Sequence, residues 1–195
     1  MASSTSHGSD LPEGAAMAPE DSARVLPGAV RQIGYVVRDL DAAIESWVAL
    51  GVAPWFTLRR QRSPNWYRGV RSEPVISLAF ANSDELQIEL IQQEDDAPSI
   101  YREFLDAGNE GFHQLAWWAE DFDGVMARAT AAGWSVVCSG DGDGGTRFAY
   151  LDLGGATSTV VEVMELNDAT RWLARTVRDA ARDWNAGGPH IRELA

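Results

Sequence analysis

The stretch QIGYVVRDLD at residues 32–41 decides the fold, because it returns as QLAWWAEDFD at residues 114–123. In each copy a glutamine begins an apolar run typical of a strand, and an aspartate then begins a helix. The two copies share residues at a constant offset of 82: Gln32 and Gln114, Asp39 and Asp121, Asp41 and Asp123, and Gly51 and Gly133. This duplication predicts two copies of one structural unit.

Each copy continues with the same order of elements. The expected elements of the first copy are a strand at 30–37, a helix at 40–50, and strands at 53–59, 74–81 and 85–92. Those of the second are a strand at 112–119, a helix that ends at Gly133, and strands near 134–138, 146–152 and 158–166. The sequence therefore predicts an α+β fold in which two βαβββ modules form one cleft.

The remaining segments lie around these modules. We place module one at 29–93, a connecting helix within 94–109, and module two at 110–166. Residues 1–28 are rich in Ser, Ala, Gly and Pro and predict a disordered tail. Residues 167–195 predict a helix and a tail. One face of that helix carries Leu173, Val177, Ala181 and Trp184, which suits packing on a sheet or in a homodimer.

Composition excludes several classes of function. The formal net charge of −13 argues against a nucleic-acid partner, since phosphate binding needs excess positive charge. No apolar run reaches the roughly 20 residues that cross a membrane, and no signal-peptide core is present. Cys138 is the single cysteine, so no disulfide forms within the chain. These features predict a cytoplasmic protein without a membrane partner.

The basic residues are all arginines, and five of them fall within residues 59–71. One interpretation is a solvated loop, since charged side chains are mostly exposed. The other is a rim that recognises an anionic ligand, because guanidinium groups match carboxylates and phosphates. The sequence leaves both open.

Strand alternation brings four polar side chains toward one cleft. Gln32, Glu89, Gln114 and Glu162 each occupy the same face as apolar neighbours two residues away. Carboxylates on such strands are costly to bury unless they are paired, hydrogen-bonded or metal-bound. The alternative is that each glutamate faces solvent on an open sheet. Alternation also turns His113 to the opposite face unless a bulge rotates it.

The repeated strand–helix starts, the ELI end of module one (residues 89–91) and the VEVM end of module two (161–164) resemble the vicinal oxygen chelate superfamily. The segments PSIYREFLDAGNEGFHQLAWW (98–118) and GDGGTRFAYLDL (142–153) are most similar to its branch of methylmalonyl-CoA epimerases and glyoxalase-like proteins. The resemblance covers about residues 30–166. It implies the paired-module fold and a small-molecule substrate.

The resemblance also implies a metal site on four strands, where His, Glu or Gln, His and Glu are common ligands. Those positions fall on Gln32, Glu89, Gln114 and Glu162, so glutamine stands at both histidine positions. Such an oxygen set suits a divalent cation such as Mg, Mn or Co, or no metal at all. The epimerases carry a further catalytic acid on the third strand of module one, where this chain reads VISL at 75–78.

A pair of buried glutamates suggests acid–base catalysis. Without a metal, Glu89 and Glu162 should share a proton, and one pKa should rise. One could then remove a proton beside a carbonyl, while Gln32 and Gln114 donate amide hydrogens to the enolate oxygen. Trp118 shares the cleft face and could stack on a substrate. Tyr101 could reach the pocket mouth or pack within its helix.

Two classes of function remain. The first is an isomerase, epimerase or lyase that acts on a small carbonyl-containing metabolite through Glu89 and Glu162. The second is a non-catalytic protein that binds and sequesters a small molecule, which the two glutamines and the eight tryptophans also suit. The paired acids favour the enzyme, because a passive apolar site has no need of them.

Overall fold

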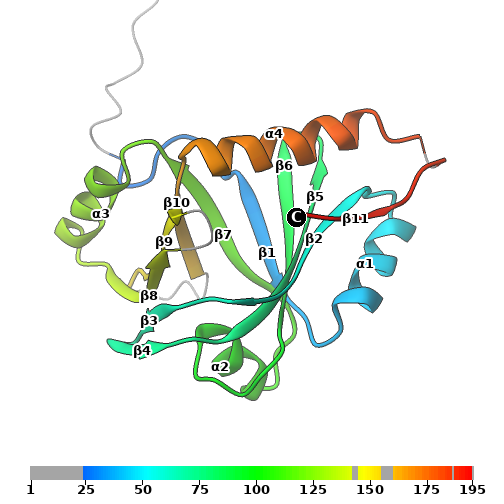
Figure 1. Cartoon of the computed structure of the whole chain (residues 1–195). Coiled ribbons are helices and arrows are strands. Elements are labelled where there is room, and N and C mark those ends of the chain that lie inside the picture. Colours follow the sequence, from blue (N-terminus) through cyan, green and yellow to red (C-terminus); the bar gives the residue numbers. More distant parts are fainter. Residues whose placement is uncertain (1–23, 142–144, 155–159, 186, 195) are drawn as a thin grey trace, which may run out of the picture.

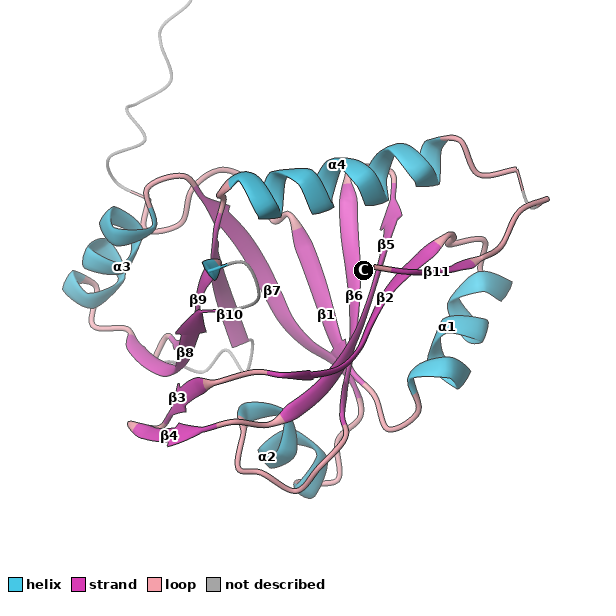
Figure 2. Ribbon diagram, viewed as in Figure 1, coloured by secondary structure: helices cyan, strands magenta, loops and turns pink. Residues whose placement is uncertain are grey.

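The computed structural model describes residues 24–141, 145–154, 160–185 and 187–194, and it confirms the α+β fold. Eleven strands within these ranges form one curved sheet (Figures 1 and 2). Their order is β11-β2-β5-β6-β1-β7-β10-β9-β8-β3-β4. The two central strands, β1 and β7, pair antiparallel and join the two modules edge to edge.

Module one supplies one half of the sheet. Its elements are β1 (Gln32–Val36), α1 (Leu40–Ala49), β2 (Trp55–Arg62), β5 (Val75–Ser83) and β6 (Leu86–Gln93). The helix begins where predicted, because the Asp39 carboxylate accepts a hydrogen bond from the Ala42 backbone N–H. It packs its buried Leu40 and Ile44 against the outer face of β5 and β6.

Module two repeats this arrangement after α2 (Ile100–Asp106), whose N-cap is Ser99. Its elements are β7 (Gly111–Ala119), α3 (Phe122–Ala131), β8 (Ser135–Asp141), β9 (Arg147–Asp152) and β10 (Val160–Glu165). The Asp121 carboxylate caps α3 by accepting from the Gly124 N–H, as Asp39 does in module one. The equivalent β1–β6 and β7–β10 pairs are both parallel.

The arginine-rich segment differs from the predicted loop. Strand β2 continues to Arg62 through a bulge between Leu58 and Gln61, and the hairpin of β3 (Asn65–Tyr67) and β4 (Val70–Ser72) follows. Strand β3 pairs with β8, so a segment of module one extends the edge of module two. The charges do not prevent strand formation, because their guanidinium groups leave the sheet and meet carboxylates.

The C-terminal segment adds α4 (Asp168–Arg182) and an unpredicted short strand, β11 (Ile191–Glu193), which pairs in parallel with β2. The helix runs over the ends of the strands β7, β1, β6 and β5 (Figure 1). Its fully buried Val177 packs with Phe56 and Phe80 of the sheet, as the predicted apolar face requires. Leu173 of the same face packs partly buried against this cluster, so this part of the face contacts the sheet of its own chain.

The predicted N-terminal tail lies mainly at residues 1–23, outside the described part. Val25 and Leu26, at its end, pack partly buried against the core of module two. Within the described residues, no helix has both the length and the apolar character needed to cross a membrane.

Candidate active site

The four central strands bring the predicted polar side chains to the concave side of the sheet. Gln32, Glu89, Gln114 and Glu162 are all buried, with at most 5% of each residue exposed. The alternative in which the glutamates face solvent is therefore wrong. The register places Gln114 opposite Gly34, and Gly34 beside Glu89.

Gln114 connects the two carboxylates. Its amide nitrogen lies 3.4 Å from Glu89 Oε2 and 3.5 Å from Glu162 Oε2, and it also lies 3.4 Å from the Tyr150 hydroxyl. Gly34 makes this position available, since a Cβ there would lie 2.1 Å from the Gln114 Nε2. Glycine at position 34 of β1 thus leaves room for the Gln114 amide to reach one glutamate from each module.

His113 fixes the orientation of that amide. The β1–β7 register shifts at Gly34/Tyr35, where Gln114 lies opposite Gly34 and Phe112 opposite Tyr35, which leaves His113 as the extra residue of a bulge. The bulge turns the buried imidazole toward Tyr150, with ring centroids 6.1 Å apart. Its Nδ1 hydrogen-bonds to Gln114 Oε1. The Gln114 N–H groups therefore face the carboxylates.

Two tyrosines complete the polar cluster. Tyr101 of α2 and Tyr150 of β9 join through their hydroxyls at 2.8 Å, and their rings meet edge to face. Burial, followed by the nearby glutamate charges, raises the pKa of both phenols well above the usual range. Both therefore remain neutral hydrogen-bond donors beside Glu162. Strand periodicity alone could have placed Tyr150 here, because it lies directly opposite Glu162 in the β9–β10 register.

The surroundings favour protonated carboxyl groups. Burial raises the pKa of Glu162 to about 7, with partial compensation by hydrogen bonds from Gln114 and Tyr150. Burial and then repulsion from Glu162 raise the pKa of Glu89 well above its usual range. Both shifts favour retention of a proton by the pair of carboxyl groups near neutral pH. One acid and one base thus lie at the same site.

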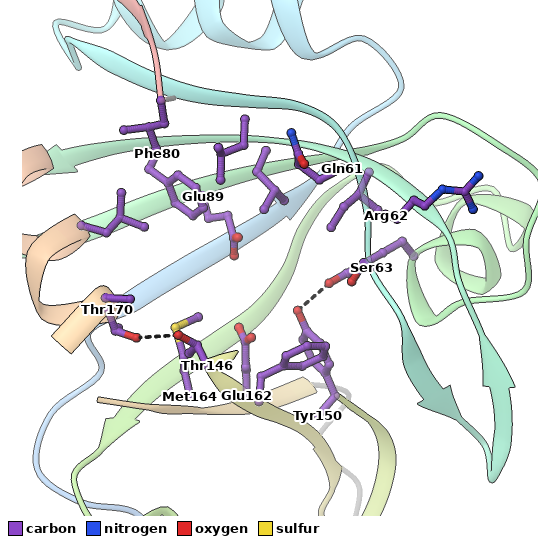
Figure 3. Close-up of a pocket in the computed structure, with 18 of the residues that line it drawn as sticks. Gln61, Arg62, Ser63, Phe80, Glu89, Thr146, Tyr150, Glu162, Met164 and Thr170 are labelled. Carbon is purple, nitrogen blue, oxygen red and sulfur yellow. Dashed lines mark hydrogen bonds between the residues drawn. The ribbon is translucent and has the colours of Figure 1, made fainter. Parts of the chain in front are cut away.

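Both carboxylates line a cavity of about 400 Å³. Figure 3 shows Glu89 and Glu162 pointing into it from opposite sides, with Tyr150 beside Glu162. Apart from these groups the walls are largely apolar. They include Leu58, Ile76, Leu78, Phe80, Phe148 and Met164 from the sheet and Leu173 from α4. This is the composition of a pocket for a small organic ligand.

Three predicted substrate-binding residues are not among those that line the cavity. The Gln114 amide is instead hydrogen-bonded to Glu89 and Glu162. Gln32 donates its amide to Gln87 Oε1 at 3.0 Å and does not line the cavity. Trp118 is also absent from the lining, and the Arg31 guanidinium lies over its ring at 5.4 Å. Alternation assigns a residue to a face, but it does not say how far along the cleft that residue lies. Tyr101 lines the cavity as predicted.

The metal set implied by the superfamily does not fit this arrangement. A cation between Glu89 and Glu162 would require the Gln114 oxygen to point at it, whereas the N–H groups occupy that direction. His113 holds the Gln114 oxygen on the other side. Among the described residues, no group of three or more His, Cys, Asp or Glu side chains is arranged to hold a metal ion.

The arginine-rich segment offers few free cations. Arg59, Arg60, Arg62 and Arg68 pair with Asp41, Glu94, Glu73 and Glu103, respectively. Arg62 also lines the cavity at its rim. Cys138 is buried, and burial raises its thiol pKa to about 12, so it is no nucleophile at neutral pH.

Comparisons with known proteins agree with this geometry. Residues 31–150 match the family model of the Glyoxalase/Bleomycin resistance protein/Dioxygenase superfamily. A crystal structure of methylmalonyl-CoA epimerase from Mycobacterium tuberculosis is similar, with 25% sequence identity and a TM-score of 0.52, over 73% of this chain and 91% of that one. A hypothetical protein from Bacillus halodurans C-125 shares the fold at 18% identity and a TM-score of 0.54, over 72% and 95% of the two chains. No curated protein matches the sequence.

Proposed function

The chain belongs to the Glyoxalase/Bleomycin resistance protein/Dioxygenase superfamily, and from that premise we propose that it is an isomerase or epimerase of a small carbonyl compound. The observation that carries the proposal is the buried pair Glu89 and Glu162, which lines one cavity and shares the Gln114 amide. The similarity to a methylmalonyl-CoA epimerase agrees with this class of reaction.

The proposed reaction is a proton transfer beside a carbonyl group. Ionised Glu162 takes the proton, so a C–H bond breaks, an O–H bond forms and the electron pair moves onto the carbonyl oxygen. Protonated Glu89 then returns a proton to carbon from the opposite wall, and the double bond is restored. Exchange of one proton between the two acids or with water resets the site. The same first step would serve a lyase if the substrate carried a leaving group beside the enolate.

Neutral donors would stabilise the enolate. The Tyr150 hydroxyl and the Gln114 N–H lie beside the carboxylates. Such donors are most effective in a site from which water is excluded. Gln32 donates its amide to Gln87 instead and is not a donor to the enolate in this proposal. The Tyr150 hydroxyl lines the cavity and would donate directly to the enolate, whereas Gln114 would act through the carboxylates to which its amide is hydrogen-bonded. The proposed chemistry therefore needs no metal.

Deuterium exchange tests the proposal without knowledge of the natural substrate. The full chain is incubated in deuterium oxide with a panel of enolisable ketones, keto acids and acyl thioesters, and NMR follows loss of the α-proton. We expect Glu89→Gln and Glu162→Gln to slow exchange by about 10²–10⁴-fold, the usual contribution of a positioned acid or base. Glu193→Gln, at an exposed site on β11, is the matched control. Exchange that is equally fast in all three variants would refute the proposal.

The largely apolar cavity also suits a protein that only binds its ligand. Native mass spectrometry of the purified chain separates this second function from the first. A stoichiometric ligand that emerges chemically unchanged, together with no α-proton exchange in any compound of the panel, would favour binding alone.

A further inference from the structure

Helix α4 forms a wall of the cavity that the matched family region does not contain. The match to the family model ends at residue 150, before β10, and α4 begins after β10 at Asp168. Ala169, Thr170, Trp172 and Leu173 of α4 line the cavity that holds the two glutamates. Leu194, which follows β11, lines the same space. The C-terminal segment therefore encloses the site that the paired modules build.

Both modules hold this wall in place. Near its start, Arg171 pairs at 2.7 Å with Glu120, which follows β7 of module two. Near its end, Arg178 and Arg182 pair with Glu85, in the turn between β5 and β6 of module one. Exposed ion pairs contribute little each, so the buried Val177 supplies most of the attachment. The helix thus bridges the cleft as a fixed part of the fold.

The enclosed space has few charges with which to hold a polyanion. Arg62 is the one arginine among the described lining residues, and its guanidinium lies 3.3 Å from Glu73. Glu89 and Glu162 make the interior acidic, and the chain as a whole carries −13. The phosphates of a nucleotide would therefore meet repulsion rather than free guanidinium groups. An apolar molecule would meet leucine, isoleucine and phenylalanine side chains.

We propose that α4 is a specificity wall, which selects a compact and mainly apolar carbonyl compound and excludes nucleotide-bearing thioesters such as those of coenzyme A. The carbonyl group in this assignment rests on the function proposed above. The size and polarity rest on the cavity alone. Leu173 and Trp172 are the specificity-determining residues of the wall, since both come from α4 and face the ligand space.

Binding of a neutral fluorescent probe, N-phenyl-1-naphthylamine, tests the wall directly. The full-length chain should bind it, 4-phenyl-2-butanone should displace it, and coenzyme A or propionyl-CoA at equal concentration should not. Leu173→Trp should weaken probe binding at least about tenfold by filling the cavity, a change of about 1.4 kcal/mol. Leu50→Trp makes the same change at a leucine that is 73% exposed, and should leave binding unchanged.

Two results would overturn the proposal: displacement of the probe by coenzyme A or its thioester as effectively as by the ketone, or unchanged binding in Leu173→Trp. If Leu173→Trp fails to fold, Trp172→Ala provides the second variant, because Trp172 is 60% exposed and its loss should alter probe affinity without unfolding the chain. If the wild-type chain binds the ketone but does not exchange its α-protons, the catalytic proposal is refuted and the specificity wall stands.

Discussion

Substitution of Glu162 by glutamine should stabilise the protein at alkaline pH and leave its stability nearly unchanged in acid. Glutamine keeps the shape of the side chain and removes its charge. Residue Glu162 is 3% exposed, and burial raises the pKa of its carboxyl group from 4.5 to about 7. Because each unit of pKa shift corresponds to 1.36 kcal/mol, ionised Glu162 costs the folded state about 3 kcal/mol.

The sign follows from proton binding in the two states. Below pH 4.5 the carboxyl is protonated in both, and the full stability is present. Between pH 4.5 and about 7 the unfolded chain releases the proton while the folded chain keeps it, so the free energy of unfolding falls. Above pH 7 both states are ionised and the loss is complete. Glu162→Gln has no carboxyl at this position and does not lose this stability. Its free energy of unfolding relative to wild type should therefore increase between pH 4.5 and about 7.

Urea unfolding at pH 5, 6, 7, 8 and 9 measures the difference between wild type and Glu162→Gln. The difference cancels the pH dependence of charges that do not interact with Glu162. Glu89 does interact with it, and loss of their repulsion in the variant lowers the pKa of Glu89 and adds to the stabilisation at alkaline pH. Glu193→Gln, at an exposed position, should give a flat difference. If the difference for Glu162→Gln is also independent of pH, the carboxyl is solvated. That result would contradict the raised pKa on which its proposed role as a base depends.

Three further predictions concern the supports of the site. Gly34→Ala should displace the Gln114 amide and slow proton exchange by roughly 10²-fold, since misplacement by about 1 Å can cost that much; unchanged exchange would contradict the bridging role. Val177→Ala should lower the free energy of unfolding in urea by about 2 kcal/mol, whereas Val136→Ala, at a residue 46% exposed, should change it little. Dialysis against EDTA should leave the melting temperature unchanged, because Gln114 presents N–H groups to the carboxylates; a decrease reversed by Mg or Mn would show a bound cation.

The sequence predicted what depends on periodicity. The repeat at an offset of 82 predicted two strand–helix units, which correspond to β1–α1 and β7–α3, and alternation placed Glu89 and Glu162 on the buried side of the sheet. Asp39 and Asp121 begin their helices as expected, since a capping carboxylate acts within three residues of itself. These features are local, or repeat locally in both copies, so a single sequence carries them.

The remaining features depend on contacts between distant segments. His113 turns into the site because of a bulge in the pairing of β7 with β1. A bulge is defined by the register of two strands, so the sequence of one strand does not reveal it. The β3–β8 and β11–β2 pairs join segments far apart along the chain. Trp118 lies on the predicted face of β7 but does not line the cavity, because α4 and the lining strands determine the extent of the cavity.

The Gln114 amide and helix α4 both affect the charge of the two acids: the amide partly compensates that charge, and the apolar wall opposes it. A cation would hold both carboxylates ionised, whereas the Gln114 N–H groups only partly compensate their charge, so one proton stays in the pair. Helix α4 adds apolar side chains to the wall, which raises the penalty for a second negative charge. In the function we propose, Gln114 and the C-terminal helix therefore both serve a shared-proton acid–base pair, within a space whose largely apolar walls suit an apolar carbonyl compound.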